Sequence, residues 1–319
     1  MSKTVLIPQD VATEGKNYLT ERGYTLKMGS GVSEQDIIRD VEGCDAILLR
    51  TAKITRPILE AGKALKIVAR HGAGYDNVDI EAANELGIWV TNAPDSTTNS
   101  VAEFTIGAII AAAKRTFLMS RTIREGNFFY KNTHKGIDLQ GKTLAIMGFG
   151  RIGSNVAKKA YYGLDMKIIA YDPYAKPERV PEYVRLVDWD EAFSSADVVS
   201  LHMPATKDNR GCVSAKEFTM MKPSALLVNC ARGELVNEAE LVRAVESGNI
   251  AGAFVDVYES EPVGADNPLL NMENVSATPH MASNTEECMI LMAVQAASQI
   301  HKVLSGEKPD WPVNKPVMK

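Results

Sequence analysis

The sequence predicts an α/β fold made of two doubly wound parallel-sheet domains, of Rossmann or flavodoxin-like type, and three observations lead to that prediction. Short apolar, β-branched runs alternate with helical patterns along most of the chain, as in parallel strands covered by helices on both faces. This alternation occurs twice, before and after a turn-rich stretch, TNAPDSTTNS at residues 91–100. The 319 residues also exceed the usual size of a single hydrophobic core.

The first third of the chain contains four expected strands separated by helical patterns. The strands are expected at residues 4–8, 24–28, 45–50 and 65–70, and the helices at Val11–Arg22, Ser33–Val41 and Pro57–Gly62. After the turn-rich stretch, a long apolar pattern from Ser100 to about Gly126 predicts one connecting helix, with Ser and Thr residues as its N-cap and Gly126 as its stop.

Strand patterns resume beyond residue 142. They are TLAIM, KIIAYD, DVVSLH, ALLVNC and GAFVDV, at residues 143–147, 167–172, 197–202, 225–230 and 252–257, and Ile152–Tyr162 reads as the helix after the first of them. A Met- and Ala-rich amphipathic pattern at residues 287–301 predicts a final helix that packs back on the first domain.

Composition argues against several classes of function. The chain has 35 basic and 40 acidic side chains without a basic run, which disfavours nucleic-acid binding. Its four cysteines lack metal-ligand spacing, and the longest apolar stretch, about residues 104–113, is far shorter than the ~20 residues of a membrane span. We therefore expect a soluble cytoplasmic protein with a small-molecule partner and no metal.

A dinucleotide-binding fingerprint follows the first strand of the second half. GFGRIG supplies Gly148, Gly150 and Gly153, and Asp172 ends the next strand 19 residues after the last glycine. The glycines would allow a tight turn, a close approach of pyrophosphate and close helix packing, while Asp172 would bind the adenosine ribose. No arginine follows Asp172 to neutralise a 2′-phosphate, so we expect NAD in preference to NADP.

Three residues complete a chemical set for reducing a 2-keto acid. Arg232, Glu261 and His280 each follow a predicted strand, where doubly wound sheets gather their ligands. Arginine can anchor a carboxylate, histidine can carry a proton near neutral pH, and a carboxylate beside it can keep it protonated. Taken singly, each could be a surface charge or a turn residue. Their joint occurrence with a nicotinamide site favours catalysis.

The segments GFGRIG, NCARGELVNE, GAFVDVYESEP and TPHMAS, in this order and spacing, resemble the D-isomer-specific 2-hydroxyacid dehydrogenase family nearly from end to end. The resemblance implies that Arg232, Glu261 and His280 are the catalytic residues. It also implies a substrate-binding domain made of residues 1–98 and 287–319, an NAD-binding domain at 99–286, an active cleft where they join, and a homodimer built on the NAD-binding domains. By the same resemblance, Arg151 and Ile152 would contact the pyrophosphate, and Met203 and Pro204 the adenosine. Cys230, Ala231 and Asp256 would contact the nicotinamide, and Ala73 and Gly74 would contact the substrate carboxylate.

Within this family, LLRTAKIT, VARHGAGYDNVD and NAPDSTTNSVAE look most like the phosphoglycerate dehydrogenases, which implies that Arg50 and Arg70 help to bind a substrate phosphate. His71 and Tyr75 depart from the small and apolar residues common there. A glyoxylate or hydroxypyruvate reductase, or a broad 2-keto acid reductase, is the alternative enzyme, and an NADH-sensing corepressor is a remote one. The printed sequence carries no extra regulatory domain of the kind found in some phosphoglycerate dehydrogenases, so we expect no serine feedback through such a domain.

Overall fold

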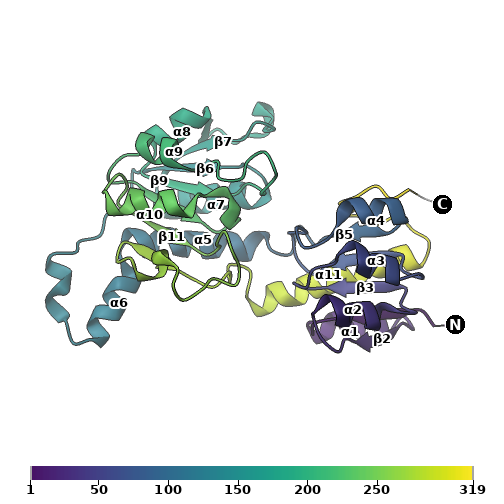
Figure 1. The fold of residues 1–319 in the computed structure, drawn as a ribbon. Coiled ribbons are helices and arrows are strands. Elements are labelled where there is room, and N and C mark those ends of the chain that lie inside the picture. The colour runs from purple at the N-terminus through teal and green to yellow at the C-terminus, as the bar shows by residue number, and fades with distance from the viewer. Residues whose placement is uncertain (1, 318–319) are drawn as a thin grey trace. The chain divides into compact units, whose positions relative to one another are not determined.

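The computed structural model describes residues 2–317, which form two compact units of parallel sheet and helices (Figure 1). Unit 1 contains the residues up to Thr98 and those from Ser283 onward, and unit 2 contains Asn99–Ala282. Every strand pair in both sheets is parallel. The predicted fold class, two doubly wound parallel sheets, is confirmed.

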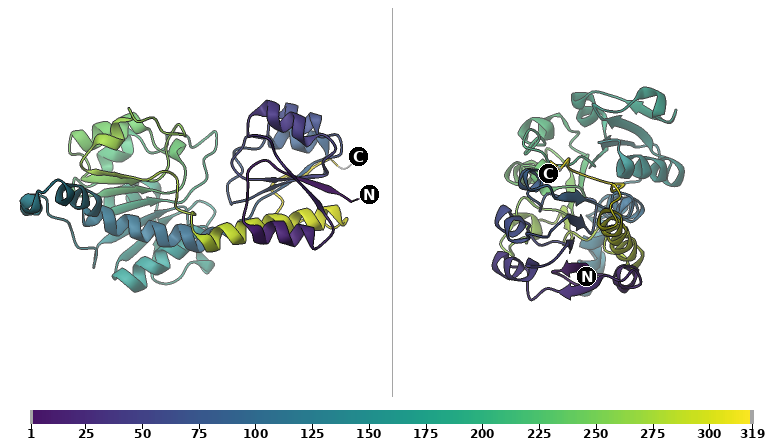
Figure 2. Two further views of the ribbon diagram at one scale, coloured as in Figure 1. Left: turned by 90° about the horizontal axis from the view of Figure 1, so that it is seen from below. Right: turned by 90° about the vertical axis from the view of Figure 1, so that its right-hand side faces the viewer.

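Unit 1 is built on a five-stranded sheet in the order β2-β1-β3-β4-β5, which is the flavodoxin-like order. Its elements are β1 (Thr4–Ile7), α1 (Thr13–Thr20), β2 (Thr25–Met28), α2 (Glu34–Val41), β3 (Ala46–Leu49), α3 (Arg56–Ala61), β4 (Ile67–Arg70), α4 (Ile80–Leu86), β5 (Trp89–Thr91) and α11 (Glu286–Leu304). Helices α2, α3 and α4 cover one face of the sheet, and α1 and α11 cover the other (Figure 2).

Side chains of β1 alternate between these two faces, as the two-residue period of a strand requires. Leu6 packs towards α2, whereas Val5 and Ile7 pack towards α1 and α11. The last helix lies tightly against α1, because a Cβ on Gly15 would come within 2.7 Å of the Cβ of Ala293. The prediction that the C-terminal helix packs on the first unit is confirmed.

Unit 2 is built on a seven-stranded sheet in the order β12-β11-β10-β9-β6-β7-β8. Its strands are β6 (Thr143–Met147), β7 (Lys167–Tyr171), β8 (Val184–Leu186), β9 (Val198–Leu201), β10 (Leu226–Asn229), β11 (Gly252–Val255) and β12 (Val275–Ala277). Its helices are α5 (Thr98–Ala113), α6 (Thr116–Arg124), α7 (Arg151–Leu164), α8 (Trp189–Ser195), α9 (Ala215–Met220) and α10 (Glu238–Glu246), with short 3-10 turns η1 (Phe128–Asn132), η2 (Pro177–Arg179), η3 (Gly233–Leu235) and η4 (Pro268–Asn271). The strand order reverses beside β6, so ligands are expected beyond the carboxyl end of this strand.

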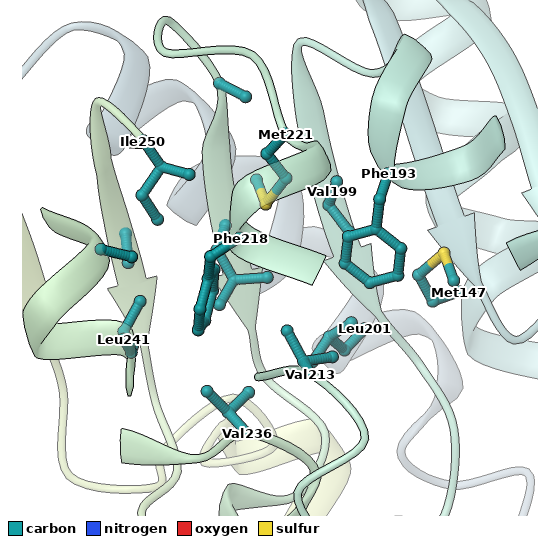
Figure 3. Close-up of a cluster of buried hydrophobic side chains, with 14 of the residues drawn as sticks. Met147, Phe193, Val199, Leu201, Val213, Phe218, Met221, Val236, Leu241 and Ile250 are labelled. Atoms are coloured by element: carbon teal, nitrogen blue, oxygen red, sulfur yellow. The ribbon is translucent and has the colours of Figure 1, made fainter. Parts of the chain in front are cut away.

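The core of unit 2 forms two layers, one on each face of its sheet. Figure 3 shows the layer under α8, α9 and α10, where Phe193 and Phe218 pack against strand residues such as Val199 and Leu201. Helices α5 and α7 cover the other face with alanine and β-branched side chains. The apolar runs recognised in the sequence are therefore strands buried on both faces, as in parallel sheets generally.

Two features of the chain were predicted incompletely or wrongly. Strands β5 and β8 have three residues each, too few to produce a recognisable pattern, and they were missed; β12, also of three residues, was expected only as a strand end before His280. The single helix expected from Ser100 to Gly126 is wrong. Arg115 adopts a left-handed conformation with φ of 53°, which separates α5 from α6, and Gly126 follows the end of α6 with φ of 81°.

No helix within residues 2–317 combines the length and apolarity that crossing a lipid bilayer would require.

Candidate active site

The glycine loop of unit 2 joins β6 to α7 in a form that only glycine permits at two positions. Gly148 has φ of 100°, and a Cβ there would lie 2.9 Å from the carbonyl of His202. A Cβ on Gly153 would lie 2.1 Å from the carbonyl oxygen of Gly148. The first glycine thus makes the turn, and the third lets α7 pack on it, as the fingerprint predicts.

The start of α7 has the features of a phosphate-binding site. Gly150 is the N-cap and provides no side-chain hydrogen bond to the first turn, while a Cβ on this residue would meet no heavy atom within 4 Å. Arg151 and Ile152 are the first two residues of this 14-residue helix. Backbone N–H groups at a helix N-terminus, with open space before them, match the pyrophosphate of a dinucleotide.

Asp172, directly after β7, is held against the glycine loop. Its Oδ2 accepts a hydrogen bond from the Phe149 N–H at 2.8 Å, and its Oδ1 accepts one from the Tyr174 N–H at 2.8 Å. Each carboxylate oxygen keeps a further lone pair for a ribose hydroxyl. Met203 also lies at the glycine loop, because its Cγ would be 3.0 Å from a Cβ added to Gly148. The next residue, Pro204, is exposed.

The Arg232 segment connects β10 to η3 and is fixed by the backbone around it. Asn229 accepts a hydrogen bond from the Ala231 N–H at 3.1 Å and donates one to the Arg232 carbonyl at 2.9 Å. The Arg232 guanidinium donates from Nη1 to the Ala231 carbonyl at 2.7 Å. A Cβ on Gly233 would lie 1.9 Å from the Tyr258 carbonyl, so this segment packs directly on the loop that bears Glu261.

Glu261 and His280 form a hydrogen-bonded pair. The Nδ1 of His280 lies 2.7 Å from Oε2 of Glu261, and the other oxygen, Oε1, accepts from the Tyr258 N–H at 3.1 Å. Burial of the Glu261 carboxyl acts to raise its pKa, but the hydrogen bond and charge of His280, with the charge of Arg232, outweigh burial and lower the pKa below its usual range. Glu261 is therefore an anion at neutral pH.

This pairing leaves Nε2 of His280 to exchange a proton. The His280 side chain is 49% exposed, so a substrate can reach it. The His280 backbone adopts φ of 50°, a left-handed conformation that costs free energy for a residue with a Cβ. The contacts of the surrounding loop offset this cost.

Asp256 holds that loop in place. It is fully buried after β11, and its carboxylate accepts hydrogen bonds from the Thr278 hydroxyl at 2.6 Å and from the N–H groups of Met281 and Ala282 at 2.9 Å each. Its carbonyl accepts from the His280 N–H at 2.7 Å. Cys230 and Ala231, which were assigned with Asp256 to the nicotinamide, lie beside Arg232, and burial raises the pKa of the Cys230 thiol.

Two other histidines are unsuited to carry a proton near neutral pH. Burial lowers the pKa of His202 to about 3, and its Nε2 lies 2.9 Å from the Ser200 hydroxyl. Burial, followed by the charge of Arg70, lowers the pKa of His71 to about 4. Both imidazoles are therefore neutral, which distinguishes them from a histidine paired with a carboxylate.

The substrate residues predicted in unit 1 gather at the carboxyl edge of its own sheet. Leu49 pairs with Arg70 across β3 and β4, so Arg50 and Arg70 occupy neighbouring strand ends. The Arg70 guanidinium donates to the His71 carbonyl. Within residues 2–317, the N–H groups of Ala73 and Gly74 donate to no protein acceptor. Two cations and two available amides therefore lie at this edge.

Unit 2 brings the candidate cofactor and catalytic residues together because β6, β9, β10 and β11 are neighbours and end at the same edge. Sequence reasoning missed Asn229, Thr278, Gly233 and Tyr258, which hold the loops that bear Arg232, Glu261 and His280. A polar residue ending an apolar strand, as in LLVN, was the available signal for Asn229. Among the described residues, no cluster of His, Cys, Asp and Glu side chains could hold a metal ion.

Residues 106–282 match the family model of the D-isomer specific 2-hydroxyacid dehydrogenase NAD binding domain. The chain belongs to this family. Unit 2 therefore carries the NAD binding domain of this family, and the predicted NAD cofactor is confirmed.

The similar proteins differ in substrate. D-3-phosphoglycerate dehydrogenase of Archaeoglobus fulgidus is 39% identical over 95% of this chain and 57% of its own length, and this chain spans about half the length of such curated relatives. Glyoxylate reductase of Korarchaeum cryptofilum is 38% identical over 90% of this chain and 88% of its own length. The solved glyoxylate reductase of Paecilomyes thermophila has a TM-score of 0.89 and 30% identity, covering 98% of both chains.

Proposed function

We propose that this protein is an NAD-dependent dehydrogenase that interconverts 3-phosphoglycerate and 3-phosphohydroxypyruvate, the first step of serine synthesis. The observation that carries the proposal is the His280–Glu261 pair, placed with Arg232 at the sheet edge that also bears the dinucleotide fingerprint. Unit 2 would hold NAD, and unit 1 would serve as the substrate-binding domain.

The site residues divide the chemistry among them. Arg232 binds the substrate carboxylate, because a guanidinium presents a fixed fork of donors to two oxygens. Bound NAD supplies the acceptor for the hydride that leaves C2. His280 takes the hydroxyl proton at Nε2 during oxidation and returns it to the carbonyl oxygen during reduction. The ionised Glu261 orients the ring through Nδ1 and balances the imidazolium charge.

The cofactor contacts follow the same pattern. We assign pyrophosphate to Gly150, Arg151 and Ile152, adenosine to Asp172, Met203 and Pro204, and nicotinamide to Cys230, Ala231 and Asp256. The carboxylate of Asp172 supports NAD over NADP, since it would repel a 2′-phosphate. Tyr174, which is 90% exposed beside it, offers no positive charge in compensation.

The phosphorylated substrate is supported by the two cations of unit 1. Arg50 and Arg70 at neighbouring strand ends suit a dianion, and the N–H groups of Ala73 and Gly74 suit a carboxylate. The D-3-phosphoglycerate dehydrogenases of Archaeoglobus fulgidus and Methanocaldococcus jannaschii, each 39% identical to this chain, also support this substrate.

A second candidate is a glyoxylate or hydroxypyruvate reductase, which would use Arg232, Glu261 and His280 on an unphosphorylated substrate. It is supported by the glyoxylate reductase of Korarchaeum cryptofilum, which is 38% identical to this chain. In that case Arg50 and Arg70 serve the structure of the strand ends.

The test is NADH oxidation measured in parallel with 3-phosphohydroxypyruvate, hydroxypyruvate and glyoxylate. A kcat/KM at least about tenfold higher for the phosphorylated compound supports the main proposal. Equal or higher values for the unphosphorylated acids select the reductase instead. Turnover of none of the three would overturn the proposed function.

We also propose that the protein is a homodimer formed through unit 2. Helix α6 and η1 project from the rest of this unit (Figures 1 and 2), and they expose Phe117, Ile123, Phe128 and Phe129, the last at 73%. An apolar patch of this kind is characteristic of a protein interface. Replacing both Phe128 and Phe129 by serine should yield monomers in analytical ultracentrifugation, whereas Tyr162→Ser, at an exposed aromatic elsewhere on unit 2, should not.

The proposed compartment is the cytoplasm. The thiols of Cys44, Cys212, Cys230 and Cys288 are all free, as expected where glutathione and thioredoxin keep cysteines reduced. Immunodetection in fractionated cells would test this location.

A further inference from the structure

A buried asparagine stands directly before the Arg232 segment. Asn229 is the last residue of β10 and is 1% exposed, whereas the three residues before it, Leu226–Val228, are apolar and buried. Burying an amide costs free energy unless its donor and acceptor groups are both satisfied. Its side chain must therefore have a specific set of partners.

The partners of the Asn229 side chain are two backbone groups that flank the peptide between Ala231 and Arg232. Oδ1 of Asn229 accepts from the N–H of Ala231 at 3.1 Å, and Nδ2 donates to the carbonyl of Arg232 at 2.9 Å. The two hydrogen bonds hold the Ala231–Arg232 peptide between them and limit rotation about its backbone. We call this pair of hydrogen bonds the bracket. The direction of the Cα–Cβ bond of Arg232, and hence the region its guanidinium can reach, is fixed by this bracket.

The bracket is tied to the rest of the site through the backbone. The carbonyl of Asn229 accepts from the N–H of Asp256 at 2.9 Å, and Asp256 in turn holds the loop of His280. On the other side, Gly233 packs against Tyr258, whose N–H binds Glu261. The Asp256 hydrogen bond before the Arg232 segment and the Gly233 packing after it both oppose a shift of this segment. The Asn229 side chain sets the position of the segment between these two contacts.

We propose that Asn229 is a positioning residue for the reaction and acts through Arg232, by aiming its guanidinium at the substrate carboxylate. This inference rests on the proposed role of Arg232 as the carboxylate anchor. Because a displacement of about 1 Å of a binding group can cost roughly 100-fold in rate, loss of the bracket should reduce kcat/KM by about 30- to 100-fold. The reduction should be mainly in KM, and NADH affinity should be unchanged.

The chain contains a matched control. Asn314 in unit 1 is 7% exposed and makes the same kind of bracket, accepting from the Val90 N–H at 2.8 Å and donating to the Ile88 carbonyl at 2.9 Å. Asn314→Ala removes equivalent hydrogen bonds far from Arg232 in the sequence. It should lower Tm comparably to Asn229→Ala while leaving kcat/KM within about twofold.

The deciding experiment is a double-mutant cycle with Asn229→Ala and Arg232→Ala, using the preferred 2-keto acid of the native protein. If Asn229 acts through Arg232, its replacement should cost about 30- to 100-fold in the native background and less than about threefold once Arg232 is absent. Equal losses in both backgrounds would overturn the inference, because a purely structural effect does not depend on Arg232.

Asn229→Asp provides a second route if the alanine variant does not fold. It retains size and an acceptor for Ala231, but it places a carboxylate oxygen against the Arg232 carbonyl, and the same cycle applies. A native protein that reduces no 2-keto acid overturns the proposed function and this inference with it. An active native protein with an additive cycle overturns only this inference.

Discussion

The carboxyl edges of the two sheets are stabilised in different ways. In unit 2, buried polar side chains such as Asn229 and Asp256 bind the backbone of the loops that carry Arg232 and His280. In unit 1, side chains that are only partly buried bind the loop backbones: Gln9 accepts from the N–H groups of Thr51 and Ala52, and Asn92 donates to the Ala73 carbonyl. The Ala73 and Gly74 amides of this edge stay available.

This difference matches two kinds of task. Proton transfer requires an acid and a substrate anchor that are fixed to within a fraction of an ångström. The hydrogen bonds that Asn229 and Asp256 make to the loop backbones of unit 2 fix them in this way. Anion binding requires positive charge and available N–H groups, which the strand-end arginines and the Ala73–Gly74 turn of unit 1 provide. We therefore expect substitutions in unit 2 to affect the reaction itself, and those in unit 1 to affect the choice of substrate.

The largest effect expected is that of His280→Ala. Loss of a general acid–base group typically costs ~10²- to 10⁴-fold in rate, and kcat should fall by about this factor. NADH affinity, measured by fluorescence titration, should stay within about twofold. His301→Ala, on α11 in unit 1, is the control and should keep its kcat. Unchanged turnover in His280→Ala would remove the proposed role of unit 2 in proton transfer.

Replacing Arg50 and Arg70 together by glutamine tests the role of unit 1. Hydrogen bonds between charged partners are worth about 1.5–3 kcal/mol each, so kcat/KM for 3-phosphohydroxypyruvate should fall by roughly 10²-fold or more. The value for glyoxylate should change little. Arg56→Gln, which breaks a surface ion pair with Glu85 at 2.8 Å, is the control. Equal losses on both substrates would mean that the two arginines do not select for phosphate.

Glu261→Gln should change how the activity depends on pH. The pKa of Glu261 is lowered, so its carboxylate stays ionised at lower pH than an ordinary glutamate. Its negative charge stabilises protonated His280, and this stabilisation is lost only as pH falls through the pKa of Glu261 in the folded protein. Without this charge, the alkaline limb of kcat/KM for reduction should move to lower pH, so activity falls more at alkaline than at mildly acidic pH. Glu259→Gln, whose carboxylate binds the Glu238 N–H, should leave the profile in place.

The smallest effects concern two glycines of unit 2. Gly233→Ala would place a Cβ 1.9 Å from the Tyr258 carbonyl, so we expect a loss of about 1–3 kcal/mol in the free energy of unfolding. Gly163→Ala, within α7 and with no atom within 4 Å, should gain about 0.5–1 kcal/mol. Denaturant unfolding measures both, and a Gly233→Ala variant as stable as the native protein would contradict the close packing of the loops that bear Arg232 and Glu261.

The fold class could be predicted because buried parallel strands leave long apolar runs, and the fingerprint could be predicted because Gly148 and Gly153 have steric roles that other residues cannot fill. Strands of three residues, such as β8, leave no such pattern. The break at Arg115 was also unpredictable, since its left-handed backbone conformation is not a preference of arginine.

The candidate catalytic residues could be recognised by their chemical types, but not the network that holds them. Asn229 and Asp256 act on backbone groups of other segments, and such contacts exist only once the strands are aligned. Asp256 is an example, because its place in the sequence did not reveal that its carboxylate accepts hydrogen bonds from Thr278, Met281 and Ala282.

The packing of α11 against α1 has a consequence for synthesis on the ribosome. The face of β1 that bears Val5 and Ile7 is covered by residues 286–304, which are translated after all of unit 2. Unit 2 can fold while the chain is still growing, whereas the part of that face that α1 leaves uncovered stays exposed until the last helix emerges. Its apolar surface is thus open to chaperones, and to aggregation, for most of the time that translation takes.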